Sequence, residues 1–278
     1  DDDWIQVGND IDGETAGDRF GESIDLSLDG NILAVGAPGS NGNGIRSGIV
    51  RIYKIVNDSW IQLGNNINGE AVGDLSGQSI SLSSNGNIIA IGAPRNDGND
   101  GNIFASGHVR VYRNVNDSWI QIGNDIDGEA LTDLSGQSIS LSSNGNVSAI
   151  GAPRNDGNGS STGHVRVYSN INDNWVQLGK DIDGDASKIL SGEHISLSAN
   201  GSIIAIGARR IQGDNSPSGH VRIYRNINDS WIQVGSDIDS DPEGFITAGS
   251  KVSLSSDGTI LAIGAAKNDE NSVDSGQV

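Results

Sequence analysis

Short runs in which apolar and polar residues alternate recur along the whole chain, and Gly, Asn and Asp separate them. Side chains two residues apart share one face of a strand, so this pattern predicts β-strands rather than helices. One stretch contains four such runs, at Ser79 to Ser84, Asn87 to Pro94, Gly107 to Tyr112 and Trp119 to Gly123. The pair Asn85-Gly86 joins the first two runs, and Asn-Gly is a strong signal for a two-residue hairpin.

The four runs belong to a unit that the chain repeats. Tryptophan marks the unit at positions 4, 60, 119, 175 and 231, with spacings of 56, 59, 56 and 56 residues. A fixed period of about 57 residues with four antiparallel strands is typical of a β-propeller, in which each period forms one blade. Small residues in the second strand, Ala90 and Gly92, would let neighbouring blades approach closely. We therefore predict an all-β chain, residues 1–278, that forms a single propeller domain.

Two partial units predict how the ring closes. Residues 249–278 hold the first two strands of a unit and the start of the third, while Trp4 to Gly8 hold a fourth strand. Pairing of these segments would complete a fifth blade and leave no open sheet edge. A closed ring of five blades is therefore the favoured prediction. The alternative is a piece of a propeller with six or seven blades.

Composition narrows the range of partners. Lys and Arg number 17 against 36 for Asp and Glu, so the chain has a formal net charge of −19 and is expected to repel nucleic acid and anionic lipid. Cysteine and methionine are absent, which excludes disulfides and a cysteine nucleophile. The apolar runs are far shorter than the roughly 18 residues of a membrane span. We expect no nucleic-acid partner and no insertion into a membrane.

One motif connects the repeat with a known family. Phe20-Gly21 followed by Gly36-Ala37-Pro38 resembles the FG-GAP repeat, the blade unit of the integrin α-subunit propeller and of many secreted microbial surface proteins. The repeat variant is similar to tandem repeats in large secreted proteins of marine bacteria and microalgae. This resemblance implies a secreted or cell-surface protein, and a calcium loop between the two halves of the motif. Here that hairpin is too short and too poor in carboxylates for calcium.

A different acidic pattern is a candidate calcium site. Asp, Asn or Glu stands at relative positions 1, 3, 5 and 9 just before the Phe-Gly position of three units, and such oxygens in a turning loop suit calcium. The sets are Asp10, Asp12, Glu14 and Asp18; Asn66, Asn68, Glu70 and Asp74; and Asp125, Asp127, Glu129 and Asp133. The favoured alternative is a solvated turn between blades. A second acidic loop, Asn96 to Asn102, is a weaker candidate.

Histidine and tryptophan also recur at fixed positions. Histidine begins the third strand of three units, where we predict that it shields the blade edge rather than shares a metal ion. These residues are His108, His164 and His220. The tryptophans are candidate sugar-stacking residues, although a Trp at a fixed strand position in each blade is more often a packing residue between sheets. The candidates are Trp60, Trp119 and Trp175.

Catalysis has little support in the sequence. Acid-base chemistry needs two groups in different environments, yet nearly every Asp and Glu has an equivalent in another unit. His194, Lys188 and Glu243 are singular but form no recognisable motif. We therefore predict that the protein is not an enzyme, and that it is a secreted structural or adhesion module that binds a protein or a glycan. The alternatives are a multivalent lectin with one weak site on each blade and, less favoured, a propeller glycoside hydrolase.

Overall fold

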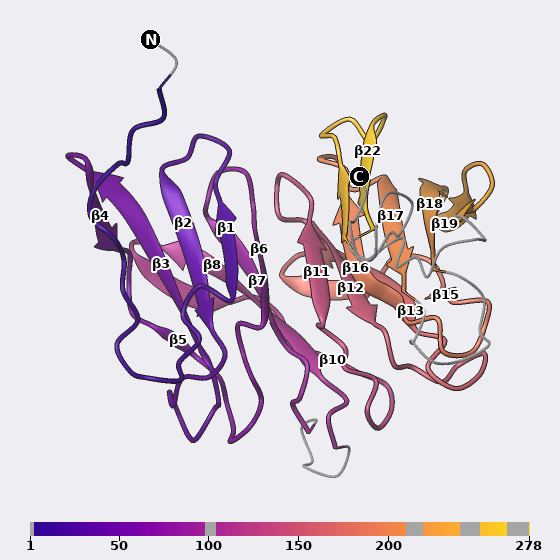
Figure 1. Ribbon diagram of the computed structural model, residues 1–278, viewed down its shortest axis with the longest axis horizontal. Helices are drawn as coiled ribbons and strands as arrows, with labels where there is room; N and C mark the ends of the chain where they lie inside the picture. The colour runs from indigo at the N-terminus through magenta and orange to yellow at the C-terminus, as the bar shows by residue number, and fades with distance from the viewer. Residues whose placement is uncertain (1–2, 98–103, 210–218, 240–250, 266–277) are drawn as a thin grey trace, which may run out of the picture.

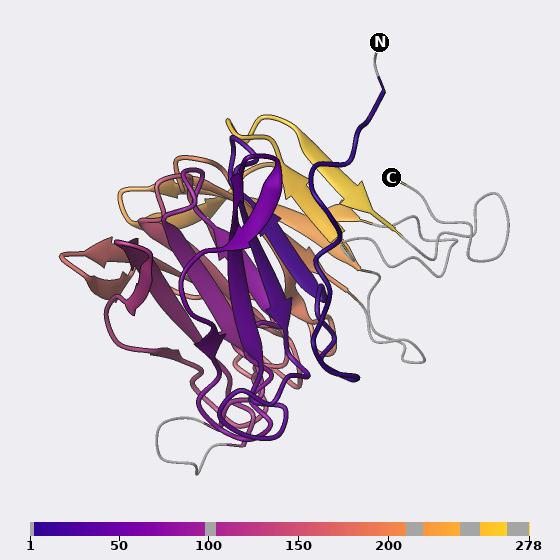
Figure 2. The same ribbon diagram turned by 90° about the vertical axis from the view of Figure 1, so that its left-hand side faces the viewer.

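The computed structural model describes residues 3–97, 104–209, 219–239, 251–265 and 278. Within these ranges the regular structure is entirely β-strand, and the strands form sheets that follow one another along an arc (Figure 1). Figure 2 looks onto the first blade and shows the later sheets behind it. Each sheet is one blade of a propeller, so the predicted all-β class and blade architecture are confirmed.

Four blades share one pattern, in which three antiparallel strands lie side by side in chain order and two short strands pair with the third. The first blade contains β1 (Ser23–Leu26), β2 (Ile32–Ala37), β3 (Ile49–Val56), β4 (Ser59–Gln62) and β5 (Ile67–Asn68). The second contains β6 (Ser79–Leu82), β7 (Ile88–Ala93), β8 (His108–Val115), β9 (Ser118–Gln121) and β10 (Ile126–Asp127).

The later blades repeat this order. The third contains β11 (Ser138–Leu141), β12 (Val147–Ala152), β13 (His164–Ile171), β14 (Asn174–Gln177) and β15 (Ile182–Asp183). The fourth contains β16 (Ser191–Leu197), β17 (Ile203–Ala208), β18 (His220–Ile227), β19 (Ser230–Gln233) and β20 (Ile238–Asp239). In the described residues of the fifth, β21 (Lys251–Leu254) pairs with β22 (Leu261–Gly264).

The outer edge of each blade is divided between two short strands. In the first blade β4 pairs with the second half of β3, whereas β5 pairs with its first two residues. Asn57 and Asp58, which join β3 to β4, both have positive φ angles, 49° and 56°. A two-residue type I′ turn requires this conformation, and Asn and Asp tolerate it better than most residues.

The apolar core lies between consecutive sheets. One cluster joins Val50 and Ile52 of the first blade with Ile80 and Ile89 of the second, and equivalent clusters lie at the next two junctions. A blade therefore buries its apolar faces only against its neighbours, as in other repeat folds. On the first blade, Ile24 is 67% exposed, whereas its equivalent Ile80 is 9% exposed beneath the first blade.

Two glycines set the distance between neighbouring blades. Gly92 in β7 lies against Gly136 of the next unit, and a Cβ atom added to Gly92 would overlap the Gly136 carbonyl oxygen and the Ser79 hydroxyl. The Ser79 hydroxyl donates a hydrogen bond of 2.6 Å to that same carbonyl. The Gly136 N–H in turn donates to the carbonyl of Gly151, in its own blade, at 3.1 Å. The contact therefore links one blade to the next through backbone and a small side chain.

Hydrogen bonds also join the blades along their inner and outer edges. Along the inner edge, the turns between the first two strands form a chain of backbone bonds: Leu28 to Ser84, Ser84 to Ser143, Ser143 to Ala199 and Ala199 to Ser256, each at 2.8–2.9 Å. Along the outer edge, the indole N–H of Trp119 donates to the Leu63 carbonyl of the previous unit at 3.0 Å. Trp175 and Trp231 make the same contact with the next two blades, so these three tryptophans pack between blades.

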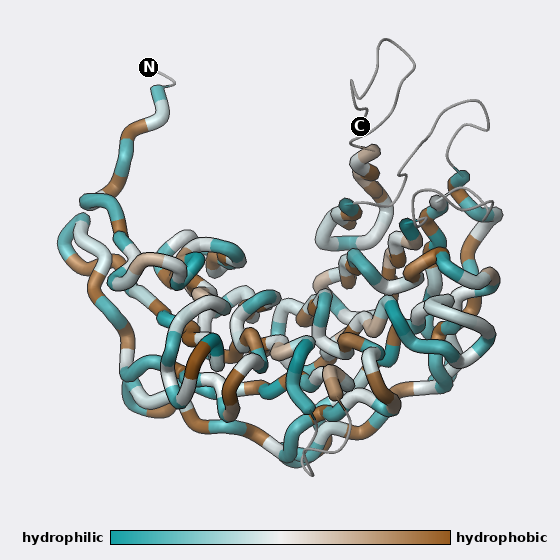
Figure 3. Tube along the Cα trace, turned by 60° about the horizontal axis from the view of Figure 1, so that its bottom comes forward, coloured by the Kyte–Doolittle hydropathy of each residue, from teal (hydrophilic) through white to brown (hydrophobic). Residues whose placement is uncertain are grey.

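Within the described residues, the N-terminal segment does not pair with the fifth blade. The prediction that this segment closes the ring is therefore corrected. Trp4 is fully exposed, residues 3–7 form no strand, and the two ends of the arc lie apart (Figure 3). A Cβ atom on Gly8 would lie 3.3 Å from Trp60 Cδ1, and Gly64 stands in the same relation to Trp119. This Gly–Trp contact places the segment on the first blade, where the outer strand of a preceding blade would lie. The alternative of six or seven blades stays a prediction.

Replacement of Gly92 by Ala should weaken the junction, because the added methyl group collides with backbone atoms that cannot move independently. We expect Gly92→Ala to lower the free energy of unfolding by about 3 kcal/mol, at the upper end for overpacking. Gly264→Ala is the matched control, since the same position in the fifth blade has its nearest neighbour, Lys251 Cβ, at 3.4 Å. Urea denaturation of the two variants measures the difference, and equal stabilities would contradict the role of this contact.

Candidate functional site

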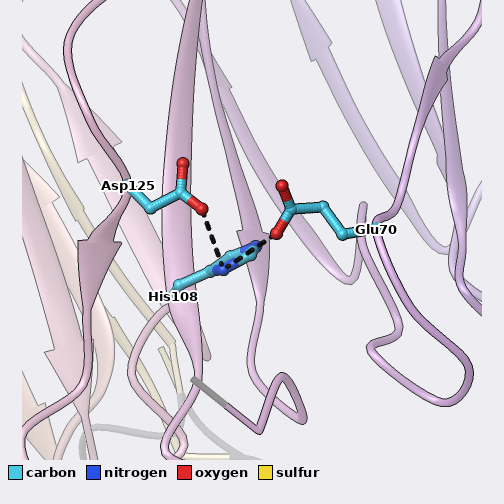
Figure 4. Close-up of side chains that lie close together, drawn as sticks. All are labelled: Glu70, His108 and Asp125. Carbon is cyan, nitrogen blue, oxygen red and sulfur yellow. Dashed lines mark ion pairs between the residues drawn. The ribbon is translucent and has the colours of Figure 1, made fainter. Parts of the chain in front are cut away.

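The most distinctive cluster of chemical groups combines residues from two successive units. His108 is the first residue of β8, Glu70 follows β5 in the loop between the first two blades, and Asp125 immediately precedes β10. His108 is 1% exposed, and its Nδ1 atom faces Asp125 Oδ2 at 3.6 Å and Glu70 Oε2 at 3.9 Å (Figure 4). Both distances exceed a hydrogen bond. The imidazole and the two carboxylates therefore surround a common point without bonding directly.

Each carboxylate of this cluster is held by a donor on its other oxygen. Gln121 Nε2 donates to Asp125 Oδ1 at 2.6 Å, and Arg110 Nη1 lies 3.2 Å from Glu70 Oε1. The remaining oxygens are the two that face His108. Such partners fix the orientation of a carboxylate in the same way as the outer-shell residues of metal sites.

Burial keeps the His108 ring neutral. Burial, reinforced by the positive charge of Arg110, lowers the pKa of His108 to about 4, although Asp125 opposes the shift. Burial also raises the pKa of Glu70, against the influence of Arg110. A neutral imidazole offers a nitrogen lone pair, which is the form of histidine that binds metals. The cluster thus holds three groups that could bind a cation.

The next unit repeats the arrangement. His164 Nδ1 lies 3.7 Å from Asp181 Oδ2 and 4.0 Å from Glu129 Oε2. Gln177 donates to the other oxygen of Asp181 at 2.6 Å, and Arg166 lies 3.4 Å from the other oxygen of Glu129. Burial likewise lowers the pKa of His164 to about 4. The geometry is therefore a property of the repeat and not an accident of one blade.

The first and fourth units differ in the groups that meet there. In the first, Ile49 occupies the histidine position and Asn66 the Asp125 position. In the fourth, His220 lies 3.9 Å from Asp185, but Arg222 binds Asp185 and also Asp237 at 2.5 and 2.6 Å. The Asp185 and Asp237 carboxylates are therefore paired with the Arg222 guanidinium group. The ligand atoms of His220, Asp237 and Asp239 still lie close enough together to hold one ion.

The structure divides the predicted acidic sets between different surroundings. Asp125 belongs to the His108 cluster, whereas Glu129, four residues later, belongs to the His164 cluster. The last member of each set closes its own turn by accepting a backbone N–H. The pairs are Thr15 to Asp18, Ala71 to Asp74 and Ala130 to Asp133, at 2.8–3.2 Å. No group of four converges on one point among the described residues.

The remaining members of these sets lie in simpler surroundings. Glu14 pairs with Arg51 at 2.6 Å, and the exposed Asp10 accepts a hydrogen bond from Gln6 at 2.9 Å. Asp12 is exposed. In the second set the Asn66 side chain accepts from Arg51 Nε at 3.2 Å. Asn68 and Asp127 each accept a hydrogen bond through the main-chain carbonyl. Arg110 donates to Asn68 at 2.8 Å, and Arg166 donates to Asp127 at 2.6 Å.

The hairpin that corresponds to the calcium loop of FG-GAP relatives does not fit calcium here. Asp29, at its tip, accepts hydrogen bonds from the Ser27 hydroxyl at 2.6 Å and from the Asn31 backbone and side chain at 3.1 and 2.8 Å. These bonds lower the pKa of Asp29. Its oxygens are thus used by the turn itself. The acidic loop Asn96 to Asn102 is described only through residue 97, and Glu243 lies outside the described residues.

Each of three successive junctions also carries a pocket with the same lining. Tyr112 and Trp119 meet Asn66 and Asn68 in a pocket of about 290 Å³. At the next two junctions the volumes are about 200 and 400 Å³. Their linings are Tyr168, Trp175, Asp125 and Asp127, and then Tyr224, Trp231, Asp181 and Asp183. Buried or half-buried aromatic rings and polar carboxylates or amides therefore line one pocket at each of these three junctions.

A signal for the His108 cluster was present in the sequence but depends on comparing units. The three units with histidine at the start of the third strand also have aspartate at the Asp125 position, while the unit with Ile49 has Asn66. The contacts join residues 38 positions apart, Glu70 and His108, as well as residues within one unit. The spacing of residues within a single acidic segment cannot predict these contacts, because they join different segments of the chain.

Comparison with known proteins supports the fold. Residues 11–53 match the family described as FG-GAP repeat, which confirms the resemblance seen in the Phe20-Gly21 and Gly36-Ala37-Pro38 motif. No curated protein matches the chain. Among solved structures, the Pseudomonas aeruginosa periplasmic gluconolactonase is similar with a TM-score of 0.57 and 17% identity over 87% of the chain. A Bacteroides uniformis protein named provisionally as a 6-phosphogluconolactonase gives 0.53 and 12% over 79%.

These comparisons correct the prediction that the protein is not an enzyme. The two similar structures named above carry the names of lactonases, so the architecture cannot serve as an argument against catalysis. At this level of identity the likeness shows the fold alone. The chain spans 64% of the length of the Pseudomonas protein and 55% of that of the Bacteroides protein. Among the described residues there is no helix with the length and apolar character that a membrane span requires.

His194, singular in the sequence, makes the fold sensitive to acid. It stands at the position of Ser79 and Ser138, and burial, aided by Lys251, lowers its pKa to about 4 from 6.5. In the unfolded chain the His194 imidazole binds a proton below about pH 6.5, whereas in the folded chain it stays neutral until the pH falls to about 4. The stability contribution is present above pH 6.5 and is lost as the pH falls toward 4.

Replacement of His194 by serine, the residue of the other units, should flatten this dependence. Between pH 6.5 and about 4 we expect the variant to lose about 1 kcal/mol less unfolding free energy than the unmodified chain, a figure reduced for partial solvent access. Chemical denaturation across this range measures the slope. The other histidines titrate equally in both proteins, so identical slopes would contradict the assignment.

Proposed function

We propose that the protein binds carbohydrate at its blade junctions, with one pocket per junction, and acts as a multivalent lectin. The observation that carries the proposal is the recurrence of one pocket lining, a Trp and a Tyr with amides or carboxylates, at three successive junctions. Aromatic faces suit the apolar face of a sugar ring, and amide and carboxylate groups suit its hydroxyls. The names of the two lactonase structures point to the same class of ligand.

Size and multiplicity are consistent with this function. The pockets, about 200–400 Å³, are small compared with most small-molecule sites, so each would hold about one sugar residue. A single site of this kind binds weakly. Several sites on one rigid arc can engage a polymer together, and the linked binding raises the overall affinity by about 10²–10⁴.

A location outside the cell agrees with a glycan partner, and we propose it on that ground. The FG-GAP resemblance and the periplasmic neighbour both favour an exported protein. Extracellular glycans, or glycosylated surface proteins, are the partners this location would supply. Calcium in the acidic segments is not needed for this proposal, since the aromatic and polar linings suffice.

Exposed residues on the pocket rims allow a test that spares the core. Asn65, Asn124 and Lys180 occupy the same rim position at the three junctions. We expect their single Ala variants to weaken binding to immobilised glycans by about 10-fold, and the triple variant to abolish it, because avidity is lost with each site. The Lys54→Ala variant, an exposed change outside these pockets, is the control. Binding is measured on a glycan array, with melting temperature as the check on folding.

The tryptophans give a second, direct readout. Trp119, Trp175 and Trp231 line the pockets, so a bound oligosaccharide should shift their fluorescence in the unmodified chain and leave it unchanged in the triple variant. If the unmodified chain binds no glycan on a broad array, the proposal is overturned. Undiminished binding by the folded triple variant would overturn the assignment of the pockets.

Hydrolysis of a sugar lactone is a second candidate, favoured by the likeness of the fold to the two lactonase structures. Ring opening needs a group that activates water, and Glu70 and Glu129, which are partly exposed beside buried histidines, could serve. We expect δ-gluconolactone to be hydrolysed faster than its spontaneous rate and the acceleration to disappear in Glu70→Gln/Glu129→Gln. Acid release at constant pH measures it, and a rate equal to that of buffer would exclude this candidate.

A further inference from the structure

We propose that the Glu70–His108–Asp125 and Glu129–His164–Asp181 clusters each bind one divalent transition-metal ion of the zinc type. The ligands would be the histidine Nδ1 atom and one oxygen of each carboxylate. This site differs from the four-oxygen loops that the acidic spacing suggests, because it draws one imidazole and two carboxylates from two different inter-blade loops. The proposal does not rest on carbohydrate binding, although Asp125 and Asp181 also line two of the pockets.

The buried histidine supplies the first argument. His108 and His164 are each 1% exposed, so water has little access to either ring. Their Nδ1 atoms face carboxylate oxygens at 3.6–4.0 Å, too far for hydrogen bonds. Buried polar groups are normally satisfied. In both units the Nδ1 atom therefore points at two anionic oxygens without bonding to either, and a cation between these three atoms would satisfy all of them.

The distances supply the second argument. Tetrahedral zinc with ligand bonds of about 2.0–2.1 Å separates its ligand atoms by about 3.4 Å. The N···O separations of 3.6 and 3.9 Å in the first cluster, and 3.7 and 4.0 Å in the second, exceed this by a few tenths of an ångström. A small inward movement of the partly exposed Glu70 and Glu129 carboxylates would bring the three ligands into place.

The surrounding donors leave the ligand atoms free. Gln121 and Arg110 each bind the oxygen that faces away from His108, and Gln177 and Arg166 do the same around His164. In the fourth unit, by contrast, Arg222 binds Asp185 and donates to both oxygens of Asp237, so neither Asp237 oxygen is left free for a metal. We therefore expect two ions per chain, neither of them at His220.

The imidazole determines the class of metal. Calcium and magnesium prefer oxygen ligands throughout, whereas zinc, nickel and copper accept imidazole nitrogen readily. Three protein ligands also leave a fourth position, and the 44% exposure of Glu70 gives water access to it. An ion at each cluster would connect the loop entering a blade to the loop leaving it.

Titration of the full chain, without a histidine tag, tests the proposal. Isothermal calorimetry with zinc chloride should give two sites, unaffected by millimolar calcium, and cobalt should give the visible absorption of a tetrahedral nitrogen and oxygen site. His108→Gln should leave one site and His108→Gln/His164→Gln none. Glutamine is the residue at this position of the fifth unit, Gln277. His220→Gln is the matched control and should keep two.

Asp125→Asn provides a second variant that copies Asn66 of the first unit, in case His108→Gln fails to fold. It should weaken the corresponding site by at least 10-fold while circular dichroism stays unchanged. Absence of zinc binding by the unmodified chain would overturn the proposal, as would two sites retained in the folded double histidine variant. Displacement of zinc by equimolar calcium would overturn the assignment of the metal class.

Discussion

The contact between two glycines of successive blades is the constraint on which the rest of the structure depends. Gly36 of the Gly-Ala-Pro triplet lies against Gly77 of the next unit, and the Ser23 hydroxyl donates to the Gly77 carbonyl at 2.7 Å. Both halves of the FG-GAP motif therefore contribute to one joint, on opposite sides of a blade interface. A side chain on Gly36 would separate the sheets, and the apolar core between them would lose its packing.

The fixed joint explains why chemistry recurs at the junctions. Because every blade meets the next at the same spacing, a residue in one inter-blade loop reaches the same partner in each unit, as Glu70 reaches His108 and Glu129 reaches His164. Units then differ through single substitutions at these positions. Ile49 replaces the imidazole in the first unit, and in the fourth the carboxylates pair with Arg222. The fold holds the geometry constant while the chemistry varies.

Arginine and carboxylate charges are paired at the blade junctions. The chain carries a formal net charge of −19, yet Arg51, Arg110 and Arg166 are buried along equivalent strands, each beside a carboxylate of the preceding loop. These pairs orient the acidic side chains at the junctions. Burial of the neighbouring histidines keeps them neutral, so the net field at each cluster is negative and favours a cation.

The sequence by itself determined the repeat, the strands, the hairpin turns and the propeller class, because these follow from local periodicity and from Asn-Gly and Asp-Gly pairs such as Asn85-Gly86. Only the tertiary structure decided which polar residues meet. The spacing from Asp125 to Asp133 suggested one loop of ligands, but the chain turns there and divides these residues among several contacts. Contacts between blades join residues tens of positions apart, and alternation along a strand carries no information about them.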